Sequence, residues 1–413
     1  MNLPDACVCH ILSFLEDDAL QVTKRVSKRL LSLSSSMRRV VDLRETPRDV
    51  FVRDLIVGNT GGITIGLRRF PPATGAPAAH EPITGFPKRF VSSVFMCGAS
   101  DDLYKCDLAY MTCLDVQPLH FRSLAIPHLE GILQACTQLR TLALPRAIIP
   151  PGGVRALATM SKLARLDISD ARFAPGTRIV FPPSLTDLKA SYCVLESHNI
   201  GDLAKLKHLN ATDIGLDRES LGKIMKLTNL ESLDISWNDS WENVAHQPHD
   251  ISRLVKLRSL SACMMTNLRA YYRVTGLGSL RNLVSIELEN CNLWNADVEW
   301  MAAGTNVALL NLSYNYIGAA GVAHICRASQ FTAIDLSYNN VDDEGARTLS
   351  GQTRLERLEL QHNFVTSEGA RELAGMTLRS LGLAQNLVSE TEADEIMEAS
   401  AIPRLYIGRQ RKN

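Results

Sequence analysis

The sequence lacks an excess of charge, a long apolar run and a basic leader. It has 413 residues, with 44 Lys and Arg against 44 Asp and Glu, so its formal net charge is zero. No basic domain or long block of like charge is present, which excludes the simplest electrostatic case for binding nucleic acid or an anionic membrane. No stretch approaches the roughly 18 uninterrupted apolar residues of a membrane span. The amino terminus has no basic region ahead of an apolar one, so we expect no secretory signal peptide.

The cysteines are not arranged in pairs. The closest two of the ten are Cys7 and Cys9, and no two cysteines stand with two residues between them. This spacing argues against both a zinc site and a disulfide framework. We expect small, buried, hydrophobic cysteines in a reducing compartment, and we predict neither a metal nor another cofactor.

Catalytic motifs are also absent. The sequence has no nucleophile motif, no glycine loop that could hold phosphate and no paired metal-ligand spacing. Isolated histidines such as His120 and His324 are typical of exposed or structural side chains. We therefore predict that the protein is not an enzyme. A GTPase activator that supplies an arginine from a repeat scaffold stays an alternative, because many arginines are available and the sequence does not distinguish among them.

What the sequence does have is an internal repeat. The pattern L-x-x-L-x-L-x-x-(N, C or small) recurs at intervals of 21 to 27 residues. Its first positions are Leu139, Leu163, Leu185, Leu206, Leu230, Leu257, Leu283, Val307, Phe331, Leu355, Leu378 and Ile402. Recurrence at a nearly fixed period is the signature of a stack of similar structural units.

The pattern indicates a short strand in every repeat. The fourth and sixth residues point to one side of a strand, and the fifth points to the other. One repeat cannot bury its leucines alone, so the repeats must stack and share a continuous core. With copies such as Leu310–Asn315 and Ile334–Asn339, the sequence resembles the leucine-rich-repeat family. The resemblance implies an α/β solenoid with parallel strands on a concave face and short helices on the convex face.

The ninth position of the pattern holds an amide or a small side chain. Asparagine stands there at Asn238, Asn315, Asn339, Asn363 and Asn386, and a small residue at Ala147, Ala171, Cys193 and Cys291. An asparagine at this place can bond backbone groups where the chain leaves the strand. Cysteine at this position is common in the family, so we expect Cys193 and Cys291 to be structural.

The segments between strands predict a convex helix. About fifteen residues remain after each strand, enough for a turn and a two-turn helix. The pairs Gly321-Val322, Gly345-Ala346 and Gly369-Ala370 follow their asparagines at the same offset, as Gly153-Val154 follows Ala147. We expect Asp342 and Ser367 to cap two of these helices. The segments resemble the short Gly-Ala-Leu-Ala repeat, best known from F-box proteins that plant-pathogenic bacteria deliver into host cells.

Upstream of residue 136 the repeat becomes irregular. Val91 to Ala99, Leu103 to Met111 and Phe121 to Leu129 fit the strand pattern loosely, and we interpret residues 89–135 as irregular early repeats. Residues 44–88 are rich in glycine and proline, a composition that opposes both helices and central strands. We predict a linker over 44–88 and the regular solenoid over 136–413.

Residues 1–43 predict a helical module. Apolar residues recur there at helical spacing after Leu3-Pro4-Asp5, and Pro4 suits a first helical turn. With the Ile11-Leu12-Ser13 run and Val26-Ser27-Lys28, the segment resembles the three-helix F-box, which in that family docks onto the Skp-type adaptor of a cullin ubiquitin ligase. The resemblance implies an adaptor-binding surface made of Leu3, Pro4, Val8, Ile11, Leu12, Leu15, Leu20 and Val26.

Three positions depart from the F-box pattern. Cys7 and Cys9 stand where larger aliphatic residues are usual, and Leu30 where tryptophan is frequent. Each departure removes buried apolar surface worth about 1 kcal/mol from the adaptor contact. The alternative is a helical cap that seals the first repeat, and helical periodicity does not separate the two.

Two outward columns of the strand face are candidates for partner binding. The fifth position is acidic on balance, with Asp234, Glu287, Asp335 and Glu359, and would attract a basic partner, although aspartate there is also the family's ordinary preference. The eighth position is aromatic in several repeats, with Tyr192, Trp237, Tyr314, Tyr338 and His362. We expect the last three to form one patch, serving either as interface anchors or only as a stack along the repeats.

These features together predict a two-part adaptor. The amino-terminal module would recruit the Skp-type adaptor, and the repeats would hold a target protein for ubiquitin transfer by other subunits. A binding scaffold without a ligase link is the alternative. Because cullin ligases are eukaryotic, we expect the protein to act in the cytosol or nucleus of a eukaryotic cell, its own or a host's, with no contact to nucleic acid or membrane.

Overall fold

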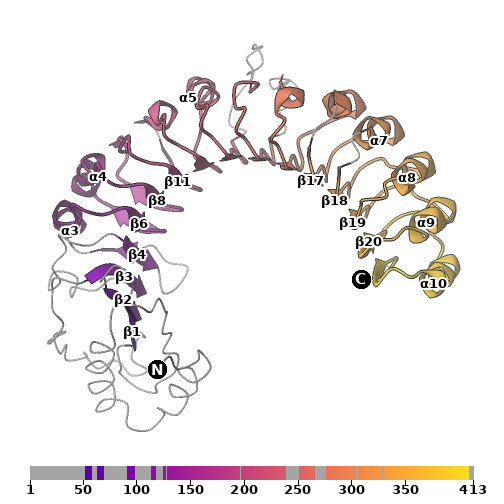
Figure 1. Ribbon diagram of the computed structural model, residues 1–413, viewed down its shortest axis with the longest axis horizontal. Coiled ribbons are helices and arrows are strands. Elements are labelled where there is room, and N and C mark those ends of the chain that lie inside the picture. Colours follow the sequence, from indigo (N-terminus) through magenta and orange to yellow (C-terminus); the bar gives the residue numbers. More distant parts are fainter. Residues whose placement is uncertain are drawn as a thin grey trace, which may run out of the picture. The chain divides into compact units, whose positions relative to one another are not determined.

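The computed structural model describes residues 52–57, 63–68, 91–97, 113–117, 124–126, 128–195, 197–238, 251–265, 276–303, 306–327 and 330–408. The predicted F-box segment lies outside these residues. The chain divides into two compact units, residues 1–184 and 185–413. Each unit is built from strands that run side by side, with helices beyond them (Figure 1).

The first unit contains one sheet with a mixed edge. β1 and β2 pair antiparallel, and every later pairing from β2 through β3, β4 and β6 to β8 is parallel. The strands are β1 (Val52–Val57), β2 (Ile63–Arg68), β3 (Val91–Cys97), β4 (Cys113–Gln117), β6 (Thr141–Ala143) and β8 (Arg165–Asp167). A small second sheet joins β5 (Leu124–Ala125), β7 (Ala147–Ile149) and β9 (Arg172–Phe173). The unit also contains α3 (Leu129–Ala135), α4 (Pro151–Ala158) and β10 (Arg178–Ile179).

The second unit contains a parallel sheet with one strand per repeat. In order these are β11 (Asp187–Lys189), β13 (His208–Asn210), β14 (Ser232–Asp234), β15 (Ser259–Ser261), β16 (Ser285–Glu287), β17 (Leu309–Asn311), β18 (Ala333–Asp335), β19 (Arg357–Glu359), β20 (Ser380–Gly382) and β21 (Arg404–Tyr406). Each pairs with the next in sequence order, and residues at equal repeat positions are partners, as Leu310 and Ile334 are.

Helices follow most strands of the second unit. They are η4 (Ile200–Asp202), α5 (Arg218–Ile224), η5 (Leu277–Ser279), η6 (Asn295–Ala303), α7 (Ala319–Cys326), α8 (Asp343–Ser350), α9 (Ser367–Ala374) and α10 (Glu390–Ala399), where η marks a 3₁₀ helix; β12 (Ser197–His198) is a short additional strand. Helices α7 to α10 cover one side of strands β17 to β20 (Figure 1).

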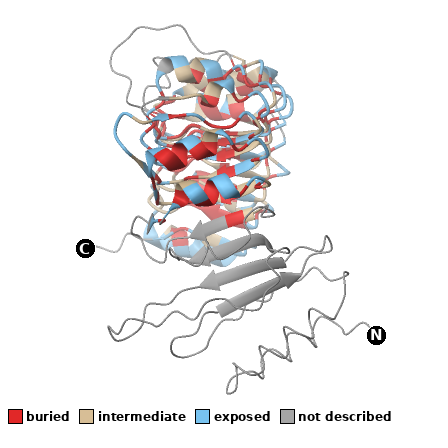
Figure 2. Ribbon diagram, turned by 90° about the vertical axis from the view of Figure 1, so that its left-hand side faces the viewer, coloured by how far each residue is buried: buried red, intermediate tan, exposed pale blue. Residues whose placement is uncertain are grey.

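The repeat beginning at Leu355 shows how the core forms. Leu355, Leu358 and Leu360 are all buried, and so are Val365 after the turn and Leu373 of α9. Buried residues recur in the strands and helices of the described repeats (Figure 2). Since burial of one leucine side chain stabilises by about 1.5–3 kcal/mol, a repeated set of this kind dominates the folding energy. All twelve predicted strands are present at the predicted positions, and the predicted solenoid is confirmed.

The Gly-Ala pairs have a steric explanation. A Cβ at Gly345 would lie 2.7 Å from Val341 Cγ1, and one at Gly369 would lie 3.0 Å from Ala346 Cβ of the preceding helix. These distances leave no room for a side chain. The glycine therefore lets each helix begin close to its own turn and to the helix before it.

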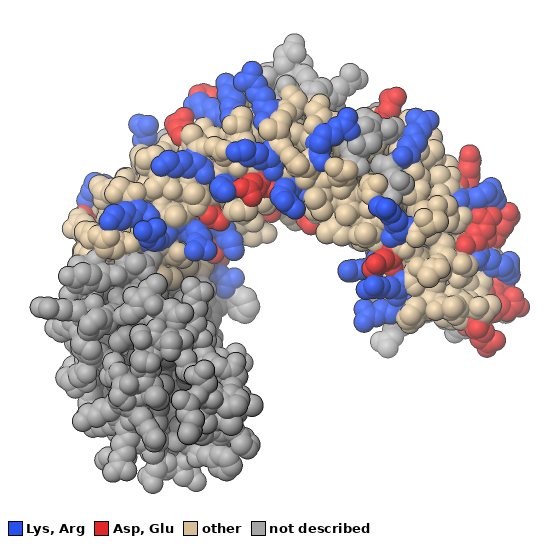
Figure 3. Space-filling model, viewed as in Figure 1, with Lys and Arg blue, Asp and Glu red and all other residues tan. Residues whose placement is uncertain are grey.

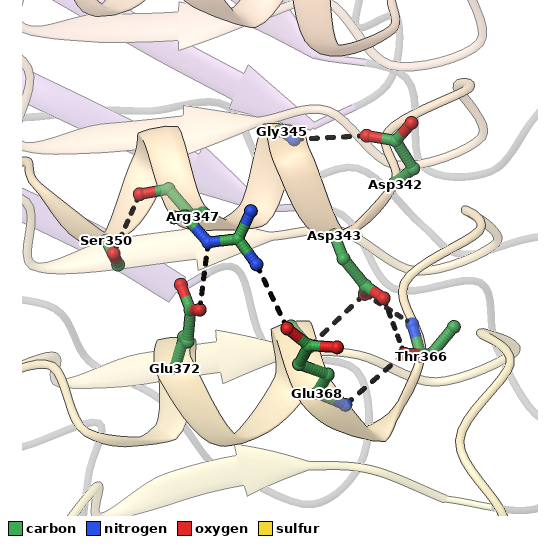
Figure 4. A network of polar contacts seen from close by, with 9 residues as sticks. Asp342, Asp343, Gly345, Arg347, Ser350, Thr366, Glu368 and Glu372 are labelled. Carbon is green, nitrogen blue, oxygen red and sulfur yellow. Dashed lines mark hydrogen bonds and ion pairs between the residues drawn. The ribbon is translucent and has the colours of Figure 1, made fainter.

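Helix capping is partly as predicted. The Asp342 side chain accepts a hydrogen bond from the Gly345 N–H at 3.1 Å and caps α8. The prediction that Ser367 caps α9 is wrong, because Thr366 is the N-cap and Ser367 is the first helical residue. Asp343 of the preceding repeat accepts from the Thr366 N–H at 2.8 Å and from the Gly369 N–H at 3.2 Å (Figure 4). Part of the cap is thus supplied by the neighbouring repeat.

Three expectations for the irregular parts need correction. Strands β1 and β2 both lie inside the predicted linker, where they pair with each other and β2 also pairs with β3. The absence of strands predicted there is therefore wrong for Val52–Val57 and Ile63–Arg68. The sheet strand after β3 is Cys113–Gln117, beyond the predicted Leu103–Met111, of which the structure describes nothing. Within Phe121–Leu129, the two-residue β5 belongs to the second sheet.

A convex helix is also missing from the two shortest repeats. Between β8 and β11 the described chain has only β9 and β10, and between β11 and β13 it has only β12 and the 3₁₀ turn η4. These repeats are 22 and 21 residues long, so fewer residues remain for a helical turn between strands.

Candidate protein-binding surface

The eighth residue of each repeat has an unusual backbone. From Arg146 to Gln385 it adopts a positive φ, 56° at Tyr314, 55° at Tyr338 and 54° at His362. This left-handed conformation is uncommon outside glycine and asparagine. The N–H of most of these residues donates to the carbonyl oxygen of the seventh residue in the following repeat, Tyr314 to Ser337 at 2.9 Å and Tyr338 to Gln361 at 2.7 Å. Equal backbone geometry orients successive side chains alike, so residues at this position form an aligned column.

Three aromatic side chains of this column form a continuous stack, as predicted. The ring centroids of Tyr314 and Tyr338 are 4.0 Å apart with planes inclined by 11°, and those of Tyr338 and His362 are 4.0 Å apart with planes inclined by 16°. Both tyrosines are exposed. We call Tyr314, Tyr338 and His362 the aromatic stack. A hydrogen bond with the Tyr338 side chain raises the pKa of Tyr314 above its usual value.

The stack is supported by the buried asparagines next to it. Asn339 accepts a hydrogen bond from the Ile317 N–H at 2.8 Å, and its amide group donates to the carbonyl oxygens of Leu312 and Leu336 at 2.8 and 3.1 Å. Asn363 repeats this arrangement one strand later. Since these bonds join adjacent repeats, they fix the turns that carry the aromatic side chains. The predicted amide ladder is confirmed.

A small residue completes the ladder where asparagine is absent. Cys291 is buried, and its thiol donates to the carbonyl oxygen of Ala262 at 3.0 Å. Cys193 is buried as well. Burial raises the pKa of the Cys136 and Cys326 thiols to about 12, far from thiolate reactivity. The structural role predicted for Cys193 and Cys291 fits these surroundings.

The aspartates of the fifth-position acidic column accept hydrogen bonds within their own repeats. Asp234 accepts from the Ser236 N–H at 3.0 Å and from the Ser236 hydroxyl at 2.7 Å, and Asp335 accepts from the Ser337 N–H at 2.9 Å. Aspartate at this position therefore shapes the turn, as the family preference implied. The glutamates differ, because Glu287 is exposed and Glu359 is half-buried, and burial raises the pKa of Glu359.

Two predicted aromatic residues are separate from the stack. Tyr192 and Trp237 occupy the same column and are exposed. Asp213 stands between them in the column, and Met264 and Asn290 stand between Trp237 and the aromatic stack. The eighth column therefore provides two isolated exposed aromatics and one continuous stack.

Sequence reasoning missed a second exposed column. Tyr316, Phe364 and Leu387 hold the tenth position of their repeats, one residue past the buried ninth position, and all three are exposed. Trp294, two positions further along its own repeat, is exposed beside Tyr316, with ring centroids 5.1 Å apart. Alternation around the ninth position, with the eighth and tenth residues outward, was the signal that could have identified them.

The helices carry a further set of exposed charges. Arg347 of α8 reaches Glu368 and Glu372 of α9, each at 3.1 Å (Figure 4). Arg371 of α9 reaches Glu392 of α10 at 3.2 Å. Figure 3 shows acidic and basic side chains interleaved over these carboxy-terminal helices. Exposed pairs of this kind contribute little to stability, about 0–1 kcal/mol each.

The described residues hold no group of three or more His, Cys, Asp and Glu side chains placed to bind a metal. In the same part of the chain no helix combines the length and apolar character needed to cross a membrane. The adaptor-facing residues predicted in the first 43 positions lie outside the described chain.

Comparisons with known families find both predicted modules. The F-box domain model matches residues 1–42, and a leucine-rich-repeat model matches residues 226–239 and 331–350. No curated protein matches the sequence. An internalin structure from Listeria monocytogenes is similar with a TM-score of 0.54 and 17% identity, covering 72% of this chain and 88% of that one. A leucine-rich-repeat protein of Leptospira interrogans has a TM-score of 0.51 and 17% identity, covering 78% and 90%. At such identity the likeness concerns the fold alone.

Proposed function

We propose that this F-box and leucine-rich-repeat protein is a substrate-recognition adaptor of a cullin-type ubiquitin ligase. The observation that carries the proposal is the combination, in one chain, of an F-box match over residues 1–42 with a repeat surface that holds exposed aromatic side chains in fixed positions. The F-box supplies the contact to a Skp-type adaptor, and the repeats supply the contact to a target protein.

The role of the repeats is recognition. A rigid surface with exposed aromatic side chains loses little conformational entropy when it binds, and aromatic side chains are enriched among the residues that dominate protein interfaces. In the aromatic stack, the backbone and the buried asparagines hold the rings before any partner arrives. We expect this sheet face to be the target-binding side, with Tyr192, Trp237 and Glu287 as secondary contacts.

The mechanism is proximity. Tethering a target beside the charged conjugating enzyme turns an encounter between separate molecules into an effectively intramolecular one, with an effective concentration up to the millimolar range. The chain itself needs no catalytic group for this. Because cullin ligases are eukaryotic, the protein acts in a eukaryotic cytosol or nucleus, its own or that of a host.

The test is a pull-down of purified Skp-type adaptor by the full chain. We expect the wild type to retain the adaptor and a Leu3→Ala, Pro4→Ala double variant to lose it, because both residues belong to the predicted docking surface. Tyr338→Ala is the matched control, since it lies on the sheet face, and should retain the adaptor. If the wild type fails to bind, or the double variant binds equally well, the ligase role is refuted in favour of a scaffold without it.

A further inference from the structure

An exposed apolar strip runs along one edge of the carboxy-terminal repeats. Its members are Trp294, Tyr316, Phe364 and Leu387, with exposed fractions of 46, 44, 52 and 60%. We call these four residues the edge strip. Tyr316, Phe364 and Leu387 hold the tenth position of their repeats, and the exposed Asn340 holds it in the repeat between Tyr316 and Phe364. Single exposed apolar residues are ordinary, whereas several that lie close together are typical of an interaction site.

The backbone holds the edge strip in place. Tyr316 donates its N–H to the Leu293 carbonyl oxygen at 2.8 Å, and Phe364 and Leu387 donate to Val341 and Val365, each at 2.9 Å. The carbonyl group in each case belongs to the preceding repeat. The exposed side chains are thus aligned by bonds between repeats, as the eighth-position side chains are.

The edge strip and the aromatic stack are adjacent. Tyr314 and Tyr316 flank the buried Asn315, and His362 and Phe364 flank the buried Asn363. The two sets together form a band of exposed aromatic and aliphatic side chains, with the polar Asn340 between Tyr316 and Phe364. A partner that covers one set therefore meets the other.

Acidic side chains border this band on the strand side. Asp335 pairs in register with Asn311, on the strand that leads to Tyr314, and Glu289 directly precedes Asn290, the eighth-position residue of the repeat before Tyr314. Glu287 and Glu359 belong to the same strand face, at the fifth position of their repeats. Although Asp335 also accepts a hydrogen bond from Ser337, that bond leaves its negative charge in place.

A second acidic line borders the band on the helix side. The Trp294 N–H donates to Asp297 at 2.8 Å, and the N–H of Thr366, two residues after Phe364, donates to Asp343 at 2.8 Å. The hydroxyl of Ser389, two residues after Leu387, donates to Glu392. Hydrogen bonds from Ser367 and Ser389 lower the pKa of Glu392, which favours its charged form. Glu392 is also paired with Arg371 at 3.2 Å, so Asp297 and Asp343 contribute more to this line.

Acidic side chains outnumber basic ones in these repeats. Residues 276–408 contain more than twice as many Asp and Glu as Arg, and no Lys. Arg347 and Arg371 are paired with glutamates on the outer helices, and Arg379 is paired with Glu356. Arg357 and Arg404 are exposed on strands β19 and β21, so bases are present on the strand side as well. The repeats that carry the band have a net negative charge, which attracts positive groups.

We propose that this band binds a target segment in which aromatic or aliphatic side chains are flanked by Lys or Arg. The apolar side chains cover the edge strip and the aromatic stack, and the cationic groups meet the two acidic lines. An acidic or purely polar segment is disfavoured by repulsion and by the uncovered apolar surface. This specificity rests on the proposed function only in assigning the segment to a ubiquitination target.

The test is selection from a random peptide library displayed on phage against the full chain. We expect the enriched peptides to combine Trp, Phe, Tyr or Leu with Lys or Arg. The selected peptides should bind a Tyr316→Ser, Phe364→Ser, Leu387→Ser variant about tenfold more weakly or worse. Val194→Ser is the matched control, because Val194 holds the tenth position of a distant repeat, is 79% exposed and lies outside the edge strip; it should bind as the wild type does.

The charges are tested separately. A Glu287→Gln, Glu289→Gln, Asp343→Asn variant keeps side chains of similar shape, and an asparagine at position 343 still has an amide oxygen that can accept from the Thr366 and Gly369 N–H groups. We expect weaker peptide binding and a smaller loss of affinity with added salt than in the wild type. Enrichment of acidic or purely polar peptides, no enrichment, or equal binding by the edge-strip variant each overturns the proposal.

The two proposals fail in different ways. The edge-strip variant should still retain the Skp-type adaptor, because its substitutions lie outside the F-box. Peptide binding without adaptor binding by the wild type would refute the ligase role and keep the surface assignment. Adaptor binding by the wild type without enrichment of the expected peptides would keep the ligase role and refute the surface assignment.

Discussion

The rings of Tyr338 and His362 lie parallel within 16° and 4.0 Å apart, although the two residues stand one full repeat apart in the chain. Each ring is held by a left-handed residue whose N–H donates to the next repeat. The repeat backbone thus sets the distance between the two side chains, and the aromatic rings provide the stacking contact. This separation of roles leads to distinct expectations for stability and for binding.

Substitutions at Tyr338 should distinguish the stabilisation by ring stacking from the cost of the left-handed backbone conformation. Tyr338→Gly removes the stacking energy, about 0.5–1.5 kcal/mol, but relieves a left-handed conformation that costs a non-glycine residue about 1–2 kcal/mol. Tyr338→Val removes the same ring and keeps a branched residue where φ is 55°. We expect urea unfolding to show the Gly variant close to the wild type and the Val variant clearly less stable. Equal stability of the two variants would contradict the backbone argument.

The buried amide ladder should be sensitive to single substitutions. Asn339→Ala leaves the Ile317 N–H and the Leu312 carbonyl oxygen without their side-chain partner. Unpaired buried groups cost about 1–3 kcal/mol, so we expect the free energy of unfolding to fall by at least that amount. Asn340→Ala is the control, since Asn340 is exposed and its substitution should change stability by under about 0.5 kcal/mol. Similar losses in both variants would argue against a ladder role.

Glycine substitutions should have opposite signs in two helices. A Cβ at Gly369 meets Ala346 Cβ and Val365 Cγ1, each at 3.0 Å, whereas nothing lies within 4 Å of a Cβ at Gly131 of α3. Alanine is favoured over glycine inside a helix by about 1 kcal/mol. We expect Gly131→Ala to raise the unfolding temperature and Gly369→Ala to lower it, as measured by circular dichroism. An unfolding temperature raised by both would show that α8 and α9 have room to separate.

Glu359 should make stability depend on pH. Burial raises its pKa above the usual 4.5, so the folded state holds this proton more firmly than the unfolded state does. Folding is then favoured below the usual value and loses that contribution as the pH rises through the raised one. We expect the wild type to lose stability relative to Glu359→Gln as the pH increases across this window, measured by urea unfolding at several pH values. A constant difference between the two would refute the assignment.

The repeat register could be predicted from the sequence because it depends on burial with a fixed period. Leu355, Leu358 and Leu360 mark their strand by spacing alone, and the same spacing locates all twelve strands. The aromatic stack followed from the same register. Asn363 could be assigned to the ladder because its position in the repeat fixes which backbone groups it can reach.

Features that depend on contacts between repeats were missed. Thr366 rather than Ser367 caps α9 because Asp343 of the preceding repeat bonds to the Thr366 N–H. Strand β2 forms within a glycine-rich segment because β1 and β3 offer pairing partners on both sides, which composition does not reveal. The edge strip could not be predicted from the repeat pattern, because that pattern ends at the ninth position and Phe364 is the tenth residue of its repeat.

The buried ninth position fixes the turn, while the eighth and tenth positions face solvent. Side chains in these two exposed columns can therefore change while the backbone that carries them stays the same. If the proposed binding role is right, exchanging Tyr316 or His362 for another side chain should alter which partner is bound, while Asn315 and Asn363 maintain the fold. Related chains can therefore diverge in partner by point substitution at these columns, with no insertion, deletion or new loop.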